Sequence, residues 1–178
     1  HFAQKNAMNI DGLGPEWLSK LLEKGFIRNI ADIYEINAEE LLQLDGMGEK
    51  LASNILLSIE NSKDRPLANL LFSLGIAHVG IDVSKLLMGR FSGISELGSA
   101  SYEEIIDIDG IGPVIASGVK KFFERPLTNL ILDKLRKSGL NLEEHRTELF
   151  VSGDFSGKRF CFTGSLDSFS RSQAEDMV

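Results

Sequence analysis

A short glycine pattern recurs four times at a nearly constant interval, and it constrains the fold more than any other feature of the chain. In each copy an apolar residue and a glycine stand directly before an amphipathic stretch. The four copies are Leu13-Gly14, Met47-Gly48, Val79-Gly80 and Ile111-Gly112. Their glycines are 34, 32 and 32 residues apart, and a period of this length is typical of helical repeat proteins.

Three of the four copies carry a longer string, in which Asp-Gly precedes the apolar residue and the second glycine. These strings are residues 10–14, 44–48 and 108–112. The second half of the chain also repeats part of the first, because a shift of 64 residues superposes Asn37–Leu42 on Ser101–Ile106. We therefore predict two repeated units, each with two glycine turns.

Local signals in the first 140 residues are helical. Asn37 with Glu40 and Ser101 with Glu104 form capping-box patterns at equivalent positions of the two units. After each turn glycine, apolar residues return at helical spacing. No strand pattern precedes residue 140, so the sequence predicts an all-α domain over residues 1–140.

The pattern changes after this domain. Residues 141–154 begin with a polar and charged stretch and are interpreted as a linker. Arg159–Thr163 alternates like a short strand, and Ser170 with Gln173 resembles another capping box. We expect residues 155–178 to form an incomplete α/β segment.

Composition excludes several classes of protein. The 19 Lys and Arg against 26 Asp and Glu give a formal charge of −7, so bulk positive charge does not hold a polyanion here. Cys161 is the single cysteine, which rules out an internal disulfide or a multi-cysteine zinc site. The longest apolar stretch, Leu67–Val79, is interrupted by polar residues, and it predicts no membrane span. The first residues read neither as an initiator methionine nor as a secretory signal.

A Gly-apolar-Gly turn before a helix is suited to binding an anion. Glycine supplies a positive φ or room for close approach, and the unpaired N–H groups and dipole of a helix start favour a phosphate. Main-chain donors need no Lys or Arg, so the negative charge does not exclude contact with a nucleic-acid backbone. The candidate binding residues are Gly12, Gly14, Gly46, Gly48, Lys50, Gly75, Gly80, Gly110 and Gly112.

Individual positions refine this hypothesis. The apolar residue between the glycines is expected to point inward and anchor each turn. In the third copy His78 replaces the first glycine and Gly75 is the nearest other one, which predicts a longer turn. Lys50 either joins the amides on a phosphate or is an ordinary surface lysine. Lys120 and Lys121, with Arg125, are interpreted as an exposed face rather than a binding patch.

The turns resemble the helix-hairpin-helix motif. Four of them, followed by residues 155–166, resemble the C-terminal half of the bacterial NAD-dependent DNA ligases, a family in which a four-motif helix-hairpin-helix domain precedes a BRCT domain. Ala7–Gly14 and Leu71–Gly80 extend the similarity, which covers nearly the whole chain. One hairpin is shared by many repair proteins, whereas four in this order are specific.

The resemblance implies binding to the backbone of double-stranded, nicked DNA, independent of sequence, within a ligase that seals nicks in replication and repair. It implies NAD, magnesium and zinc for the parent ligase, and no cofactor, metal or catalytic residue in this chain. The family's Lys-x-Asp-Gly signature is absent, since Asp11, Asp45 and Asp109 lack a lysine two positions earlier. We expect the fragment to be inactive alone.

The same resemblance implies a BRCT-like segment over residues 155–178 and a bacterial cytoplasmic protein at the nucleoid, without a membrane partner. The N-terminal domains of the same ligase are the implied protein partners. Two alternatives stay open. In the first, the chain is a helix-hairpin-helix module of another DNA-repair protein. In the second, it is a helical protein-docking module.

Overall fold

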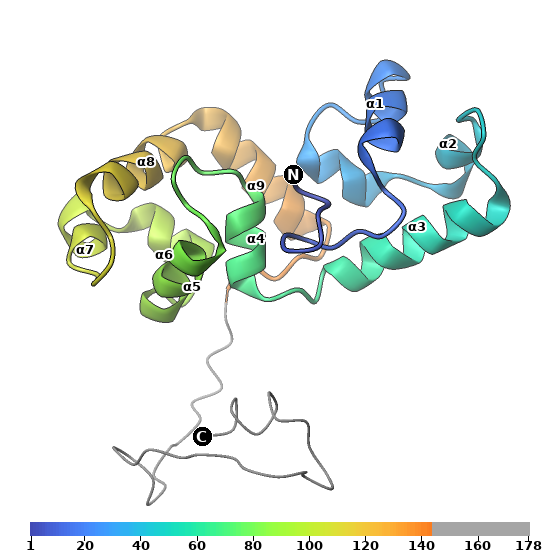
Figure 1. Ribbon diagram of the computed structural model, residues 1–178. Helices are drawn as coiled ribbons and strands as arrows, with labels where there is room; N and C mark the ends of the chain where they lie inside the picture. Colours follow the sequence, from blue (N-terminus) through green and yellow to red (C-terminus); the bar gives the residue numbers. More distant parts are fainter. Residues whose placement is uncertain (144–178) are drawn as a thin grey trace, which may run out of the picture. The chain divides into compact units, whose positions relative to one another are not determined.

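A computed structural model describes residues 1–143 of the chain (Figure 1). Contacts divide the chain into residues 1–145 and 146–178, and all of the described residues belong to the first unit. The predicted linker from residue 144 onward, the predicted strand at 159–163 and the BRCT-like segment at 155–178 lie outside the described residues.

The described residues form nine α-helices and one 3-10 helix, with a single isolated bridge between Gly93 and Glu143. The prediction of an all-α fold is confirmed. The elements are α1 (Pro15–Glu23), η1 (Ile30–Glu35), α2 (Ala38–Leu42), α3 (Glu49–Ser62), α4 (Leu67–Ser73), α5 (Ile81–Arg90), α6 (Ile94–Ser99), α7 (Tyr102–Ile106), α8 (Pro113–Phe123) and α9 (Pro126–Lys137).

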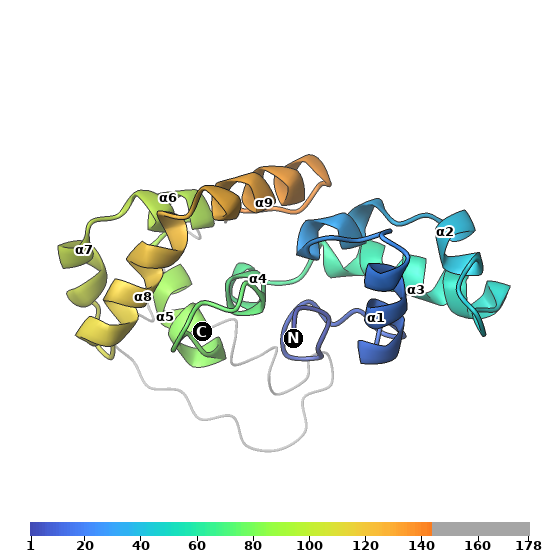
Figure 2. The same cartoon turned by 90° about the horizontal axis from the view of Figure 1, so that it is seen from above.

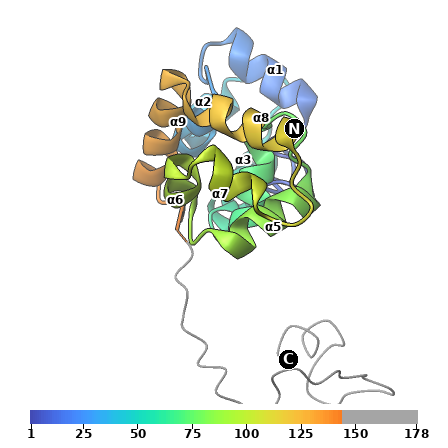
Figure 3. The ribbon, with the colours of Figure 1, turned by 90° about the vertical axis from the view of Figure 1, so that its left-hand side faces the viewer.

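The helices form two halves, as the internal repeat predicts. α1, α2 and α3 lie on one side of α4 and α9, and α5 to α8 lie on the other side (Figures 1 and 2). Figure 3 looks from the side of the second half, with α5, α6, α7 and α8 nearest the viewer. The last helix, α9, packs against α8 of its own half and against η1 of the first half.

Both capping boxes predicted within residues 1–140 are present, and the pattern at Ser170 and Gln173 lies outside the described residues. The side chain of Asn37 accepts a hydrogen bond from the N–H of Glu40, whose carboxylate accepts one from the N–H of Asn37. Ser101 and Glu104 repeat this arrangement at α7, and hydrogen bonds from Ser101 hold the pKa of Glu104 below its usual value. The internal repeat of the sequence therefore includes the capping boxes at the starts of α2 and α7.

The core runs through both halves and past the last helix. Leu21, Ile55, Leu87 and Leu135 are among its fully buried side chains. Leu142 is buried as well, and its carbonyl accepts a hydrogen bond of 2.8 Å from the N–H of Ile94. The packed core thus continues into the first residues of the segment interpreted as a linker.

Candidate nucleic-acid interface

The four repeated turns share one backbone geometry. In each, the N–H of the apolar residue donates to the carbonyl three residues earlier, and the residue before the apolar one has a positive φ, as in a type II turn. The bonds are Leu13 to Ile10 (3.3 Å), Met47 to Leu44 (3.0 Å), Val79 to Ile76 (3.0 Å) and Ile111 to Ile108 (3.0 Å). The positive angles are those of Gly12 (83°), Gly46 (88°), His78 (65°) and Gly110 (86°).

The third turn differs from the others in residue type but not in shape. Its connection, residues 74–80, is one residue longer than residues 43–48 of the second copy, as the sequence predicts. The additional residue precedes the turn, because Gly75 ends α4 and its N–H donates to the carbonyl of Phe72. His78, not Gly75, therefore occupies the left-handed position of the third turn. The connection is thus longer than in the second copy, but the expectation of a longer turn is wrong, because the turn from Ile76 to Val79 has the same length as the other three.

The apolar residue of each turn anchors it to the core. Leu13, Met47, Val79 and Ile111 keep only 2–8% of their surface exposed. The prediction that these side chains point inward is confirmed. A turn fixed in this way holds the following helix start at a constant position relative to the core.

The second glycine of each turn is the N-cap of a helix and serves a different purpose from the first. Gly14, Gly48, Gly80 and Gly112 have φ between −78° and −99°, which any residue can adopt. A Cβ added to any of the four would meet no atom of the described residues within 4 Å. Glycine at these positions therefore leaves open space in front of the helix start.

In the part of the chain that the structure describes, the N-cap residues of these helix starts provide no side-chain cap for the first N–H groups. No N-cap side chain bonds the first turn of α1, α3, α5 or α8, whereas Asn29, Asn37 and Ser101 cap η1, α2 and α7. The first intrahelical bond of α3 is the one from Ala52 to Gly48, so the preceding donors lack a helical acceptor. α1 and α8 begin with proline and have one donor fewer.

In the first half, each turn packs against the helix that follows the other turn. The N–H of Asp11 donates to Oγ of Ser58 on α3 at 2.6 Å. In return, Nζ of Lys20 on α1 donates to the carbonyl of Asp45 at 3.0 Å, and Gly46 faces Trp17. These contacts bring the first and second turns together as a pair. Sequence reasoning missed Ser58 and Lys20, because nothing in the local pattern marks contacts separated by 47 and 25 residues.

In the second half, too, each turn packs against the helix that follows the other turn, but through different residues. Gly110 of the fourth turn faces Leu86 of α5, and an added Cβ would lie 3.3 Å from its Cδ1. Gly118 of α8 lies against the third turn, where an added Cβ would be 3.1 Å from the carbonyl oxygen of Ala77. The third and fourth turns therefore form a second pair.

Charge at the helix starts is not uniform. α1, α3 and α5 have Glu16, Glu49 and Asp82 in their first turns, and α8 has no acidic residue there. Glu16 is paired with Lys20 at 2.9 Å. Lys50 is exposed in the first turn of α3, where its ammonium has no partner among the described residues. An anion at the start of α8 meets the least local repulsion from first-turn side chains.

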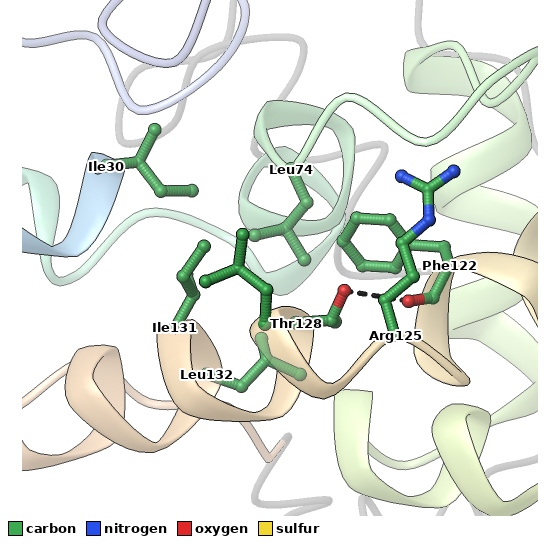
Figure 4. A pocket seen from close by; sticks show the side chains of 8 residues that line it. Ile30, Leu74, Phe122, Arg125, Thr128, Ile131 and Leu132 are labelled. Atoms are coloured by element: carbon green, nitrogen blue, oxygen red, sulfur yellow. Dashed lines mark hydrogen bonds between the residues drawn. The ribbon is translucent and has the colours of Figure 1, made fainter. Parts of the chain in front are cut away.

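A separate apolar cavity of about 200 Å³ lies among η1, α4, α8 and α9 (Figure 4). Ile30, Leu74 and Ile131 line it together with Phe122, whose carbonyl accepts a hydrogen bond from the Thr128 hydroxyl at 2.7 Å. None of its lining residues belongs to the four turns. Its chemistry suits an apolar group rather than a phosphate.

The described residues contain no cluster of three or more His, Cys, Asp or Glu side chains that could hold a metal ion. Among residues 1–143, no helix has the length and apolar character needed to cross a bilayer.

Comparison with known families agrees with the geometry. Residues 5–61 match the family described as the SAM-like helix-hairpin-helix tandem, and residues 69–131 match the helix-hairpin-helix motif. The described unit is a tandem helix-hairpin-helix domain. Each of the two matches lies in one half of the fold and includes both turns of that half.

The whole chain is also similar to bacterial DNA ligases. It is 46% identical to the DNA ligase of Halothermothrix orenii and 40% identical to those of Halalkalibacterium halodurans and Geobacter sulfurreducens. Each match includes 100% of this chain and 26–27% of the relative. The chain is therefore a relative of bacterial DNA ligases that spans about a quarter of their length.

Proposed function

We propose that the tandem helix-hairpin-helix domain binds duplex DNA through backbone phosphates, independently of base sequence. The observation that carries this proposal is the set of four glycine-capped helix starts with free N–H groups and open space in front of them. The similarity to helix-hairpin-helix domains and to DNA ligases supports the same function.

Each helix start contributes through main-chain donors and the positive end of the helix dipole. A phosphate oxygen accepts from the first-turn N–H groups, and the N-cap glycine lets it approach the backbone. Because every nucleotide presents the same phosphate, such contacts fix position without reading sequence. Few phosphates are neutralised by side chains, so the salt dependence of affinity is shallow compared with that of a highly basic protein.

Within this proposal the chain is the DNA-holding part of an NAD-dependent ligase that seals nicks in replication and repair in the bacterial cytoplasm, at the nucleoid. The described residues offer no metal cluster and the sequence offers no Lys-x-Asp-Gly lysine. NAD, magnesium and zinc belong to the parent enzyme in this proposal, as the resemblance to the ligase family implies, and no step of DNA binding runs through them.

A protein contact is a second candidate function, and it concerns α9 rather than the turns. Leu127, which lines the apolar cavity, is 64% exposed, and Leu130 on the same helix is 67% exposed. The guanidinium of Arg125, also in the lining, has no partner among the described residues. Exposed apolar groups next to a cavity are typical of a protein-docking surface. The partner that we propose for it is an N-terminal domain of the same ligase.

The DNA-binding proposal is tested by fluorescence anisotropy of the full chain with a labelled nicked duplex, an intact duplex and a scrambled sequence, at two salt concentrations. Gly48→Ala places a methyl group in the open space before α3. We expect it to weaken binding by at least about threefold, because the phosphate then loses part of its charge-assisted hydrogen bonding.

Gly89→Ala is the matched control. Gly89 lies in the last turn of α5, where an added Cβ also meets no atom of the described residues within 4 Å, so this change alters no helix start. Equal affinities of Gly48→Ala and Gly89→Ala for DNA would contradict binding through the helix starts. A tenfold preference for one duplex sequence over its scrambled form would contradict backbone recognition.

A further inference from the structure

An open hollow of about 610 Å³ lies beside the second pair of turns, and its lining carries more than helix-start N–H groups. His78 of the third turn, Tyr102 of α7 and three residues of α8, Val114, Ser117 and Lys121, contribute to its wall. Because Gly118 has no side chain, the backbone of α8 lies close to the carbonyl of Ala77 in the third turn. Both residues line the hollow, so its wall is formed by packed backbone.

The two neighbouring lysines of α8 have different environments. Nζ of Lys120 donates to the carbonyl of Ala100 at the end of α6, at 2.7 Å. Lys121 lines the hollow and is exposed, and its side-chain ammonium has no ion pair or hydrogen bond within the described part of the chain. One lysine therefore has a structural contact, and the other presents a free ammonium to the hollow. The interpretation of both as one exposed face does not distinguish these roles.

Other groups in the hollow add hydrogen-bonding and apolar surface. His78 is exposed and has a left-handed backbone conformation. The other three turns have glycine at this position, so the third turn alone among the four has a side chain there. Ser117 supplies a hydroxyl, and Val114, 64% exposed, supplies apolar surface. α8 is also the hairpin helix without an acidic residue in its first turn.

We propose that this hollow binds one phosphodiester of duplex DNA together with its deoxyribose. The Lys121 ammonium pairs with the phosphate, an imidazole N–H of His78 and the Ser117 hydroxyl donate to its oxygens, and Val114 and Tyr102 contact the sugar. The inference rests on the proposed function and extends it, because it assigns side-chain contacts to a surface otherwise described by main-chain donors. Its continuity with the start of α8 favours DNA over an acidic peptide as the occupant.

The experiment measures the affinity of the full chain for a nicked duplex as a function of salt, for Lys121→Ala, His78→Gly and the control Lys137→Ala. Lys137→Ala removes the same charge from the last turn of α9, outside the hollow. We expect Lys121→Ala to weaken binding about three- to tenfold and to reduce the salt slope by about one, as for loss of one phosphate contact. Lys137→Ala is expected to change affinity by less than about twofold.

His78→Gly separates binding from folding. Glycine adopts the left-handed conformation without strain, so this variant should be at least as resistant to urea as the parent chain while binding DNA more weakly. A scan of single methylphosphonates in the duplex then locates the contact. One neutralised phosphate should weaken binding of the parent chain and leave the affinity of Lys121→Ala unchanged.

Equal effects of Lys121→Ala and Lys137→Ala, or unchanged affinity of both Lys121→Ala and His78→Gly, would overturn the inference. So would a labelled oligoglutamate whose binding depends on Lys121 when DNA binding does not. If the parent chain binds duplex DNA and Gly48→Ala weakens it while the hollow variants do not, this inference fails and the proposed function stands. If the parent chain fails to bind duplex DNA, the proposed function fails with it.

Discussion

Nζ of Lys134 on α9 donates a hydrogen bond to Oδ1 of Asp32 on η1, which ties the last helix to the first half across 102 residues of sequence. Glu35 is within 2.6 Å of the same ammonium. Asp32 also accepts from the backbone N–H groups of Arg28 and Asn29, so one carboxylate closes the start of η1 and holds α9. Burial alone would raise the pKa of Asp32, but these hydrogen bonds outweigh it and hold the pKa below 3.8.

Asp32→Ala should lower the free energy of unfolding by about 1–3 kcal/mol, because it removes both a helix cap and a largely buried ion-pair partner. Asp133→Ala is the control, since Asp133 is 62% exposed and pairs with Arg136 on the same helix. We expect that change to stay within about 0.5 kcal/mol. Urea denaturation of the two variants checks this, and similar losses would show that the tie between the halves contributes little.

The same contact predicts a pH dependence. A carboxyl whose pKa is lower in the folded chain adds stability above its unfolded pKa, and this stability is lost as the pH falls through the folded value. The stability difference between the parent chain and Asp32→Asn should therefore be constant at neutral pH and shrink as the pH falls below 3.8. A difference that stays constant down to the acid limit would contradict the lowered pKa. Chemical denaturation at a series of pH values measures it.

Gly12→Ala should destabilise the chain more than Gly46→Ala. Both glycines have a positive φ, which costs an alanine about 1–2 kcal/mol. At Gly12 the new Cβ would also lie 2.9 Å from Cγ1 of Ile55, which is fully buried and has no room to withdraw, whereas at Gly46 the nearest atom is 3.8 Å away on Trp17. Urea midpoints at equal m-values provide the comparison, and the reverse order would be inconsistent with the packing of the first turn on α3.

Ser84→Ala should be neutral or stabilising by up to about 1 kcal/mol. The Ser84 hydroxyl is fully buried and has no hydrogen-bond partner among residues 1–143, and removal of such a group recovers its desolvation cost. Its position, four residues after the N-cap glycine of α5, is held by Ala52 in α3 and Ala116 in α8. In Ser73→Ala, by contrast, the lost 2.7 Å bond to the carbonyl of Leu70 should lower stability. Thermal unfolding of both variants tests the contrast.

Incubation of the chain with NAD and magnesium should yield no covalent AMP adduct. Adenylation in the family requires the lysine of Lys-x-Asp-Gly, and Asn9, Gln43 and Asp107 occupy the corresponding positions before the three Asp-Gly pairs. Intact-mass spectrometry checks this expectation directly. A mass increase equal to one AMP would contradict it, and peptide mapping would then identify the modified residue.

The features that the sequence predicts well are local in the chain. Capping boxes at Asn37 and Ser101 and the inward apolar residue of each turn depend on neighbours within a few positions, and the structure contains all of them. The left-handed conformation of His78 was not predicted, because a positive φ is uncommon at any residue other than glycine, even though histidine adopts it more readily than most. The turn closes around His78 because buried Val79 fixes the backbone on its far side.

Features that depend on distant residues were outside the reach of pattern reasoning. The difference between Lys120 and Lys121 depends on where the carbonyl of Ala100 lies, which is a property of the packing of α6 on α8. The bond between Asp11 and Ser58 likewise requires the first turn to lie on α3. Adjacent residues of one type can therefore have unrelated roles once tertiary contacts are formed.

The donors at the four helix starts belong to the peptide backbone, and this sets where the domain tolerates mutation. Exposed first-turn side chains such as Glu49 and Asp82 can be exchanged without removing a single N–H group, unless the substitute is proline. The buried residue of each turn, such as Met47, has no such freedom. A saturation library selected for DNA binding should accumulate substitutions in the first turns of α3 and α5, and few at the buried turn residues and N-cap glycines. The surface charge of the domain can therefore change without loss of the DNA-binding surface.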